Sequence, residues 1–290
     1  MILPQPSGAF EWRQLDAGTA LVCRPLEAVA RHLFTTRSWI LGSSGSAPGD
    51  TASWSDIARS MDVEPDRLLR AHQVHGASVV VQRAGRAGVE HADADVILSD
   101  DPSVVPSIQT ADCVPLLIAD SRTGSVAAAH AGWRGVSLRV PAVTVRALAE
   151  AFGSRPSVLL AAIGPAIGSC CYEVGADVRS QLEAAGLPAT DLSRWLHSEP
   201  DRSPANPPLE GLRSRAGHWF LDLWTAARDQ LIEAGVPAGQ VFTAELCTAS
   251  HPGAFCSYRR DGSRAGRQAA AIRRFAPRPS RRSRAGRRAR

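Results

Sequence analysis

Short apolar runs bounded by turn residues recur along the chain, and they have the length of β-strands rather than of long helices. Two of these runs, residues 114–120 and 125–130, flank the turn sequence Ser-Arg-Thr-Gly and predict a β-hairpin. We expect residues 266–274 to close a sheet. The other strand candidates are residues 20–25, 32–37, 77–82, 95–99, 157–164 and 241–247.

Helical patterns occur between these runs at irregular intervals. The clearest amphipathic helix covers residues 221–235 and ends at Gly235, since glycine commonly follows the last helical turn. A second helix is expected over residues 136–152, and Pro141 should start or kink it. The other helical segments are residues 54–61, with Ser53 or Ser55 as the cap, and residues 176–186.

The order of these elements favours an α+β fold. Strands and helices do not alternate regularly and a hairpin is predicted, so mixed or antiparallel sheets fit better than a doubly wound parallel sheet. A Gly/Ser-rich loop is expected at residues 41–52, and a long surface excursion rich in Pro, Ser and Arg at residues 187–217. We predict a single domain over residues 1–274 and a disordered Arg-rich tail over residues 275–290.

The net charge of +5 is a property of the C-terminal tail. Nine of the 33 basic residues are the Arg residues from Arg273 to Arg290. The rest of the chain has 24 basic and 28 acidic residues, which gives it a net charge of −4. The tail could touch nucleic acid or anionic lipid by charge alone, but it is more simply a solvated extension, and the folded part is not expected to bind nucleic acid specifically. No apolar run reaches the roughly 20 residues of a membrane span, and no signal peptide is recognisable, so we expect a cytoplasmic protein.

Three segments place reactive side chains in apolar, turn-bounded surroundings: His-Gln-Val-His-Gly, Thr-Ala-Asp-Cys and His-Ala-Gly-Trp-Arg-Gly. They contain His75, Cys113 and His130. Zinc takes imidazole nitrogen and thiolate sulfur, and a catalytic zinc site keeps one position for water or substrate. The three residues are 38 and 17 positions apart, unlike zinc-finger ligands, so a shared metal would require three elements to converge.

The predicted hairpin brings two of these residues together. Cys113 lies where its first strand begins and His130 where its second strand ends, and antiparallel pairing places both at one edge of the sheet. The alternative is that Cys113 is a small buried residue and His130 a hydrogen-bonded core histidine, and the residues alone leave both open. His72 competes with His75, because both could face a metal from a helical turn but not from a strand.

Five motifs, in this order, resemble the YfiH-like family: AHQVHG, TADCVPLLIAD, AAAHAGWRG, AIGPAIGSCCYEVG and CSYRRDGSRAGR. The resemblance covers roughly residues 20–274. This family is also called the multicopper polyphenol oxidase or laccase family, and it includes bacterial purine nucleoside phosphorylases and the mammalian protein FAMIN. The segment that follows Arg37 departs from the family pattern, so the loop there is not assigned a role.

The resemblance implies a zinc ion bound by His75, Cys113 and His130, with His75 preferred over His72. It implies an α+β fold whose mixed or antiparallel, β-sandwich-like core is flanked by helices, similar to the catalytic domain of cytotoxic necrotising factor. The implied activity is phosphorolysis of adenosine, inosine, guanosine and methylthioadenosine, together with deamination of adenosine. Purine nucleosides and phosphate are then the partners.

Phosphorolysis needs a group that holds phosphate, and Arg suits this because its planar fork binds phosphate oxygens bidentately. Asp112 could orient His75 or His130 or act as an acid/base, although it could simply cap a turn. Trp133 could stack on a purine ring, but a structural role is simpler. Candidate phosphate-binding residues are Arg37, Arg134, Arg259 and Arg260.

The other cysteines carry no assigned chemistry. In a cytoplasmic chain disulfides are not expected, so each cysteine is judged singly. Cys170, Cys171 and Tyr172 belong to a family motif but could simply pack. Cys247 and Cys256 are expected in the core.

Two other activities stay open. A laccase-like, copper-dependent polyphenol oxidase would need a His-rich cluster and a blue-copper site, usually with an axial Met, whereas this chain has eight His, two Met and no His-x-His pair. A cysteine hydrolase acting on cell-wall precursors would use Cys113 as the nucleophile and His130 as the base. A non-enzymatic binding protein is disfavoured because the whole set of candidate ligands is present.

Overall fold

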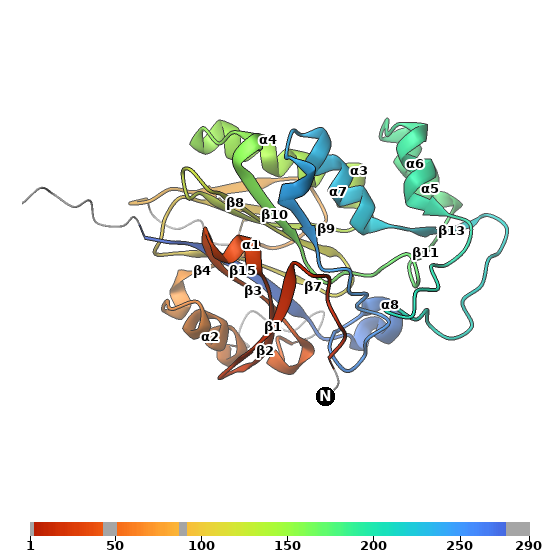
Figure 1. The fold of residues 1–290 in the computed structure, drawn as a ribbon, viewed down its shortest axis with the longest axis horizontal. Coiled ribbons are helices and arrows are strands. Elements are labelled where there is room, and N and C mark those ends of the chain that lie inside the picture. The colour runs from red at the N-terminus through yellow and green to blue at the C-terminus, as the bar shows by residue number, and fades with distance from the viewer. Residues whose placement is uncertain (1–2, 43–50, 87–91, 277–290) are drawn as a thin grey trace, which may run out of the picture.

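The computed structural model describes residues 3–42, 51–86 and 92–276, and Figure 1 shows its elements arranged in layers. The strands are β1 Phe10–Leu15, β2 Gly18–Cys23, β3 Ala30–Thr35, β4 Leu68–Leu69, β5 Val79–Gln82, β6 Val96–Ser99, β7 Val105–Thr110, β8 Val114–Asp120, β9 Val126–Ala131, β10 Leu159–Ile163, β11 Glu173–Gly175, β12 Leu196–His197, β13 His218–Leu221, β14 Val241–Thr243 and β15 Gln268–Arg274. The α-helices are α1 Arg24–Glu27, α2 Thr51–Ser60, α3 Trp133–Ser137, α4 Val140–Phe152, α5 Ala176–Ala184, α6 Ala189–Trp195, α7 Leu223–Glu233 and α8 Tyr258–Asp261.

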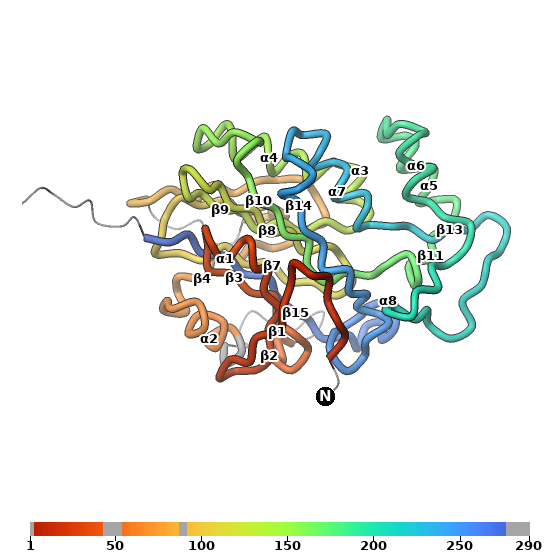
Figure 2. Tube along the Cα trace, viewed as in Figure 1, coloured from red at the N-terminus to blue at the C-terminus, as the bar shows by residue number. Residues whose placement is uncertain are grey.

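One six-stranded sheet joins the two ends of the described chain. Its order is β1-β2-β3-β15-β7-β4, and β15 pairs antiparallel with both β3 and β7. In Figure 2 the blue β15 runs beside the red β3. The prediction that residues 266–274 complete a sheet is confirmed, and the strand lies inside the sheet rather than at its edge.

The second six-stranded sheet is built around the predicted hairpin. Its order is β14-β10-β8-β9-β6-β5, and β8 and β9 pair antiparallel with Val114 opposite Ala131 and Pro115 opposite His130. The β10–β14 and β5–β6 pairs are parallel. Both sheets contain parallel and antiparallel pairs, and helices accompany them, so the predicted α+β fold with mixed sheets is confirmed. The likeness to the catalytic domain of cytotoxic necrotising factor stays a prediction.

The two sheets pack face to face and form a β-sandwich. Phe34, Ile108 and Ile272 of the first sheet share a buried core with Leu117 and Ala128 of the second. Side chains alternate between the two faces of a strand, so each sheet also presents an outer face that needs a cover. The sandwich therefore requires helices on both sides.

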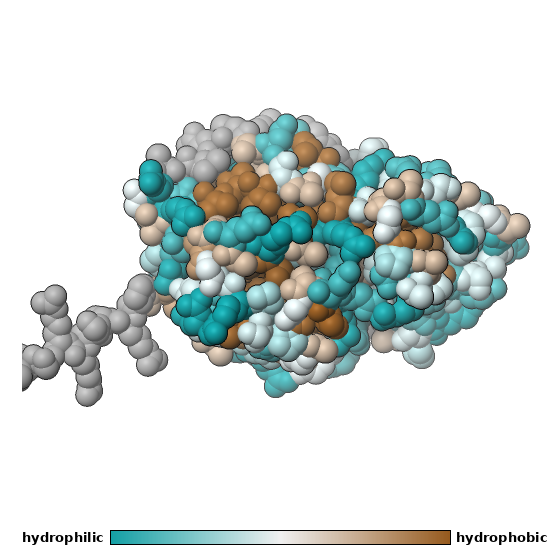
Figure 3. Space-filling view, turned by 90° about the horizontal axis from the view of Figure 1, so that it is seen from above, coloured by the Kyte–Doolittle hydropathy of each residue, from teal (hydrophilic) through white to brown (hydrophobic). Residues whose placement is uncertain are grey.

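Helices supply these covers. Trp54 and Ile57 of α2 pack on the outer face of the first sheet, and Leu148 of α4 and Leu231 of α7 pack on the second sheet around Leu116. Figure 1 shows α4 and α7 above the sandwich and α2 below it. Seen from above, several apolar patches lie among polar side chains on the exposed surface (Figure 3).

Two predicted segments differ from the structure. The helix expected over residues 136–152 is divided into α3 and α4, because Arg139 has a φ of 56° and Pro141 lies in the first turn of α4. The segment 187–217 is not a plain excursion, since it contains α6 and also β12, which pairs with β13 in a three-stranded sheet with β11.

Parts of two other predictions lie outside the described residues. These are the loop predicted at 41–52, of which residues 43–50 are not described, and the tail predicted at 275–290, which is not described from residue 277 onward. Within the described ranges, no helix has both the length and the apolar character needed to cross a membrane.

Candidate metal centre

Three side chains from distant segments meet at one end of the β8–β9 hairpin. His75, Cys113 and His130 offer ligand atoms that all lie within 4.8 Å of one another. Sγ of Cys113 is 4.0 Å from Nε2 of His75, and the rings of His75 and His130 stand edge to face with their centroids 4.9 Å apart. The convergence that the sequence required for a shared metal is present.

The hairpin positions Cys113 and His130. β8 begins directly after Cys113, and its first residue Val114 pairs with Ala131, the last residue of β9. The next residue, Gly132, adjoins Cys113 so closely that a Cβ there would lie 2.7 Å from Sγ. Glycine is needed at 132 because any side chain would displace the sulfur.

A buried carboxylate that the sequence did not reveal holds both histidines. Oδ1 of Asp95 accepts a hydrogen bond from Nδ1 of His130 at 2.7 Å and one from the backbone N–H of His75 at 3.2 Å. Its Oδ2 accepts from the N–H groups of Gly76 at 2.6 Å and Val74 at 3.3 Å. His75 has a φ of 58°, a conformation uncommon for residues other than glycine, and these bonds hold it there.

This contact also decides which nitrogen of His130 is available. Because Nδ1 donates to Asp95, the ring is fixed in one orientation and Nε2 is left as the ligand atom. Asp95 immediately precedes β6, and its only local signal was its place at the start of the apolar run 95–99.

Electrostatics couple the sulfur to the histidines. Burial alone would raise the pKa of the Cys113 thiol, but the charge of His130 and hydrogen bonds from both histidines lower it to about 6. Burial opposes protonation of His130, yet the charges of Cys113 and Asp95 raise the pKa of His130 to about 9. The thiolate, which is the form of cysteine that binds metals, is therefore favoured at neutral pH.

His72 lies outside this group. Its Nδ1 is 2.9 Å from Oδ1 of Asp93, and its side chain is 75% exposed. The preferred histidine, His75, is the one that reaches Cys113.

Asp112 has other partners than those expected. Its carboxylate accepts hydrogen bonds from Oγ1 of Thr248 and from the N–H of Arg259, both at 2.6 Å. Burial raises the pKa of Asp112 in spite of these bonds. In the part of the chain that the structure describes, no hydrogen bond joins Asp112 to His75 or His130, so the orienting role expected of it belongs to Asp95.

Two of the four candidate arginines belong to segments next to the ligands: Arg134 follows His130 by four positions, and the backbone N–H of Arg259 donates to Asp112, the neighbour of Cys113. The guanidinium of Arg259 lies 5.1 Å from the ring centre of Tyr172, and that of Arg134 lies 4.3 Å from the ring centre of Trp133. Burial and the charge of Cys113 raise the pKa of Tyr172, whereas Arg259 and Arg134 lower it. These charged groups therefore surround Tyr172 in one region.

The other two arginines are engaged within the protein. All five N–H donors of Arg260 are used, by the carboxylate of Asp261 and by three backbone carbonyls. Arg37 donates from Nη1 to the carbonyl of Pro252. The geometry leaves Arg260 without a free donor for phosphate and disfavours that prediction.

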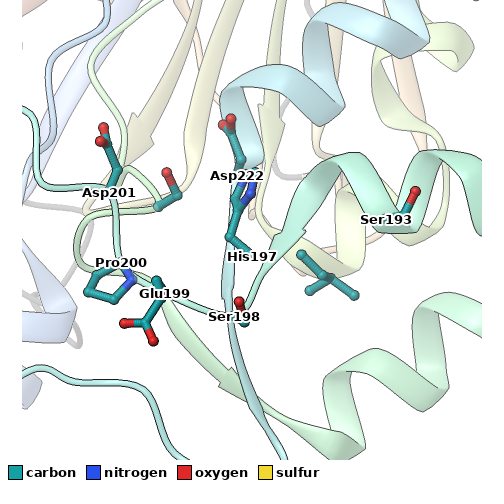
Figure 4. Close-up of a pocket in the computed structure, with 9 residues that line it drawn as sticks. Ser193, His197, Ser198, Glu199, Pro200, Asp201 and Asp222 are labelled. Carbon is teal, nitrogen blue, oxygen red and sulfur yellow. The ribbon is translucent and has the colours of Figure 1, made fainter.

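A polar hollow of about 640 Å³ lies elsewhere, beside β12. Figure 4 shows the side chains of His197, Glu199, Asp201 and Asp222 around it. None of the three candidate metal ligands lines this hollow, and the carboxylate of Asp222 is already engaged as the N-cap of α7. The chemistry of the side chains, not the size of the hollow, therefore identifies the candidate site.

Comparisons with known proteins agree with the motifs. The chain is 35% identical over 266 residues to a purine nucleoside phosphorylase of Deinococcus radiodurans, covering 88% of this chain and 93% of that protein. It is 30% identical over 218 residues to adenosine deaminase RL5 of an unknown prokaryotic organism, covering 73% and 76%. The crystal structure of the Bacillus licheniformis hypothetical protein YfiH is similar with a TM-score of 0.74 and 26% identity, covering 91% of this chain and 99% of that one.

The family model matches across most of the folded chain. It spans residues 51–274, a range that contains all three candidate ligands as well as Asp95. The resemblance to YfiH-like proteins is confirmed, and this chain belongs to the family described as multi-copper polyphenol oxidoreductase laccase.

Proposed function

We propose that this protein is a zinc-dependent purine nucleoside phosphorylase that also deaminates adenosine. The observation that carries the proposal is the convergence of His75, Cys113 and His130 on one point, with Asp95 behind them. Relatives named purine nucleoside phosphorylase and adenosine deaminase support it. The proposed nucleosides are adenosine, inosine, guanosine and methylthioadenosine.

The donor set fits zinc. Two imidazole nitrogens and one thiolate are the ligands of catalytic zinc sites that keep a fourth position open, and the Asp95–His130 contact is the kind of support such ligands have. When bound, zinc would supply Lewis-acid polarisation of substrate or water.

Copper oxidase chemistry fits less well. The Met in the described part of the chain, Met61, is buried beside α2 in a core cluster that contains none of the three ligands. Among the described residues, neither group that could hold a metal has more than two histidines. A blue-copper site with an axial Met and a His-rich cluster therefore lacks its ligands.

Arg259, Arg134 and Asp112 have separate tasks in phosphorolysis. The C1′–N9 bond of the nucleoside breaks, a C1′–O bond to phosphate forms, and the purine leaves with a proton. Arg259 and Arg134 hold phosphate, since both belong to segments next to the ligands and Arg matches phosphate geometry. Asp112 fixes the backbone of Arg259 and so positions it. In deamination, the oxygen of water adds at C6 and ammonia leaves.

The test is incubation of zinc-loaded protein with adenosine, with and without phosphate. Adenine and ribose 1-phosphate should form only with phosphate, and inosine and ammonia should form without it. Both reactions should proceed under anaerobic conditions, which an oxidase could not do. Absence of every product in all combinations would refute the proposal.

A pair of histidines three positions apart supplies the matched control. His75→Ala should lower both activities by about 100-fold or more and should remove the zinc ion held at this site, since that ion loses a ligand. His72→Ala should leave activity and zinc unchanged, because His72 pairs with Asp93 outside the site. Equal loss in both variants would contradict the ligand assignment.

A cysteine hydrolase is the second candidate, since Cys113, His130 and Asp95 also have the order of a nucleophile, a base and an orienting carboxylate. Alkylation by iodoacetamide distinguishes the two. In the proposed zinc enzyme, bound zinc protects Cys113 from the reagent. A protein that is active without metal and is inactivated by one alkylation at Cys113 would be the hydrolase.

A further inference from the structure

A second cluster of metal-ligating side chains lies outside the site described above. Cys170, Cys171 and Cys247 are almost fully buried, with at most 1% of each residue exposed, and their three sulfurs lie within 4.8 Å of one another. Cys170 and Cys171 precede β11, and Cys247 follows β14. The cluster therefore joins two segments that are 76 residues apart, from position 171 to position 247.

Hydrogen bonds of the main chain fix the position of Cys247 in this cluster. Ala166 and Cys247 form an isolated parallel bridge, in which the N–H of Thr248 donates to the carbonyl of Ala166 at 3.2 Å. The N–H of Cys247 donates to Oδ1 of Asn206 at 2.8 Å. The position of the Cys247 sulfur thus follows from a fixed main chain, which is the property that metal sites require of their ligands.

The separation of the sulfurs is that of ligands around one ion. Sulfurs bound to a single zinc at about 2.3 Å lie roughly 4 Å from each other, so the observed arrangement needs only a small contraction. Oγ of Ser250 lies 3.4 Å from Sγ of Cys170 and 3.5 Å from Sγ of Cys171. This hydroxyl, or a water bound to it, can complete a four-coordinate shell.

The surroundings favour negative charge on one sulfur of the cluster, that of Cys247, whereas the pKa values of the Cys170 and Cys171 thiols are raised. The N–H of Gly168 donates to Sγ of Cys247 at 3.3 Å. Nη1 of Arg259 lies 3.4 Å from the carbonyl of Cys171, and Nη1 of Arg260 lies 3.0 Å from the carbonyl of Thr248. The guanidinium of Arg259 therefore lies beside the main chain of Cys171, whereas that of Arg260 is paired with the carboxylate of Asp261.

The contacts of the Cys247 thiol favour its ionised form. Burial raises its pKa, but hydrogen bonds from Cys170 and Cys171, with that of the Gly168 N–H, outweigh burial and hold the pKa of Cys247 below its ordinary value. Neighbouring cysteines such as Cys170 and Cys171 do not easily form a disulfide with each other. A disulfide between Cys247 and one of these two cysteines would leave the third thiol unpaired, whereas a metal ion can bind all three sulfurs.

We propose that Cys170, Cys171 and Cys247 form a second metal site for a thiophilic d10 ion, zinc or copper(I). Thiolate ligands select these ions over hard cations, and the thiol protons are released to solvent as the ion binds. The ion is structural: it ties the segment that carries Tyr172 to the segment that follows β14. It is separate from the centre at His75, Cys113 and His130.

Metal stoichiometry of the full chain tests the proposal. The chain is stripped of metal under reducing conditions, reloaded with zinc alone or with copper(I) alone, dialysed and analysed for metal per chain. With the preferred ion, the wild-type protein should retain two per chain, Cys113→Ala should retain one, and Cys247→Ala should retain one. Cys256→Ala is the matched control, since Cys256 is also buried but lies outside both groups, and it should retain two.

X-ray absorption on the loaded Cys113→Ala variant gives a second reading that does not depend on the folding of Cys247→Ala. The remaining ion should have a shell dominated by three sulfurs. A Cys113→Ala variant that retains no ion with either metal, or a disulfide at Cys247 in the purified reduced chain, would overturn the second site. Loss of nucleoside activity with two ions still bound would instead contradict only the proposed function.

Discussion

Asp95 shows how much of the candidate metal centre depends on one carboxylate. It is completely buried, and it accepts hydrogen bonds from the ring of His130 and from three consecutive N–H groups that include that of His75. A buried carboxylate is stable only when its oxygens are fully engaged, and here the engagement positions two ligands at once.

We predict that Asp95→Asn weakens zinc binding by about 10- to 100-fold, the usual effect of losing a carboxylate behind a ligating histidine. The amide keeps the shape of the side chain but removes the charge that fixes His130. Competition with a chromogenic chelator measures the change. Asp93→Asn is the control, because the Asp93 side chain is 70% exposed and pairs with His72, which lies outside the site. Equal weakening of zinc binding by both substitutions would refute the special role of Asp95.

At this scale the sequence, with the family resemblance, predicted which three side chains converge but not the carboxylate that supports them. His75, Cys113 and His130 stood out because reactive side chains are few in apolar, turn-bounded segments. The contacts of Asp95 reach 35 positions along the chain to His130 and 20 to His75, and no local pattern encodes such distances. The same reason explains why Asp112, next to Cys113 in the sequence, was expected in the place of Asp95.

Among the elements, β2 and β3 are held together by a buried histidine. Nε2 of His32 accepts a hydrogen bond from the N–H of Cys23 at 2.8 Å, and its Nδ1 is 3.3 Å from the carbonyl of Ala30. The ring meets Phe34 edge on. Because Nε2 must be unprotonated to accept, this contact exists only with a neutral ring.

His32 therefore predicts an acid-sensitive stability. Burial lowers the pKa of His32 from 6.5 to about 4, so the unfolded chain binds the proton first as the pH falls. The stabilisation is complete above pH 6.5 and is lost between pH 6.5 and 4, with a total of about 3 kcal/mol. The free energy of unfolding, measured in urea across this pH range, should fall less steeply with decreasing pH for His32→Gln than for the wild-type protein. His197→Gln, on an exposed strand residue, should keep the wild-type slope, and a wild-type slope in His32→Gln would refute the assignment.

Elements were predictable where their pattern is local. The β8–β9 hairpin follows from two apolar runs and a turn, and α7 follows from its amphipathic period and Gly235. β7 was missed because Pro106 and Gln109 interrupt its apolar run, although the strand is largely buried between β15 and β4. α6 was missed because a helix of seven residues in a Pro- and Ser-rich segment has little intrinsic signal and depends on packing, as with Trp195 against the core.

For the whole molecule, the order of strands in the sheets could not be derived from the sequence. In the first sheet β3 pairs with β15 so that Phe34 lies opposite Ala270, and the chain between them forms the entire second sheet. Pairings over such separations are selected by the fit of two sheet faces, which is decided jointly by many buried side chains. A pattern that identifies a strand does not identify its neighbour.

A close approach of the two sheets at Gly164 predicts how strictly that fit is maintained. A Cβ on Gly164, just after β10, would lie 2.3 Å from Cδ1 of Phe34 on β3 and 3.0 Å from Cγ of Pro115 on β8. Gly164→Ala should therefore destabilise the protein by about 1–3 kcal/mol, the usual cost of overpacking a close-packed core. The free energy of urea unfolding measures this, and Phe34→Leu in the same chain should restore part of the loss by making room. Gly239→Ala, where a Cβ would meet no atom within 4 Å, should be nearly neutral. If the two alanine variants were equally stable, the sheets would tolerate a wider spacing, and contact at Gly164 would not be what sets the distance between them.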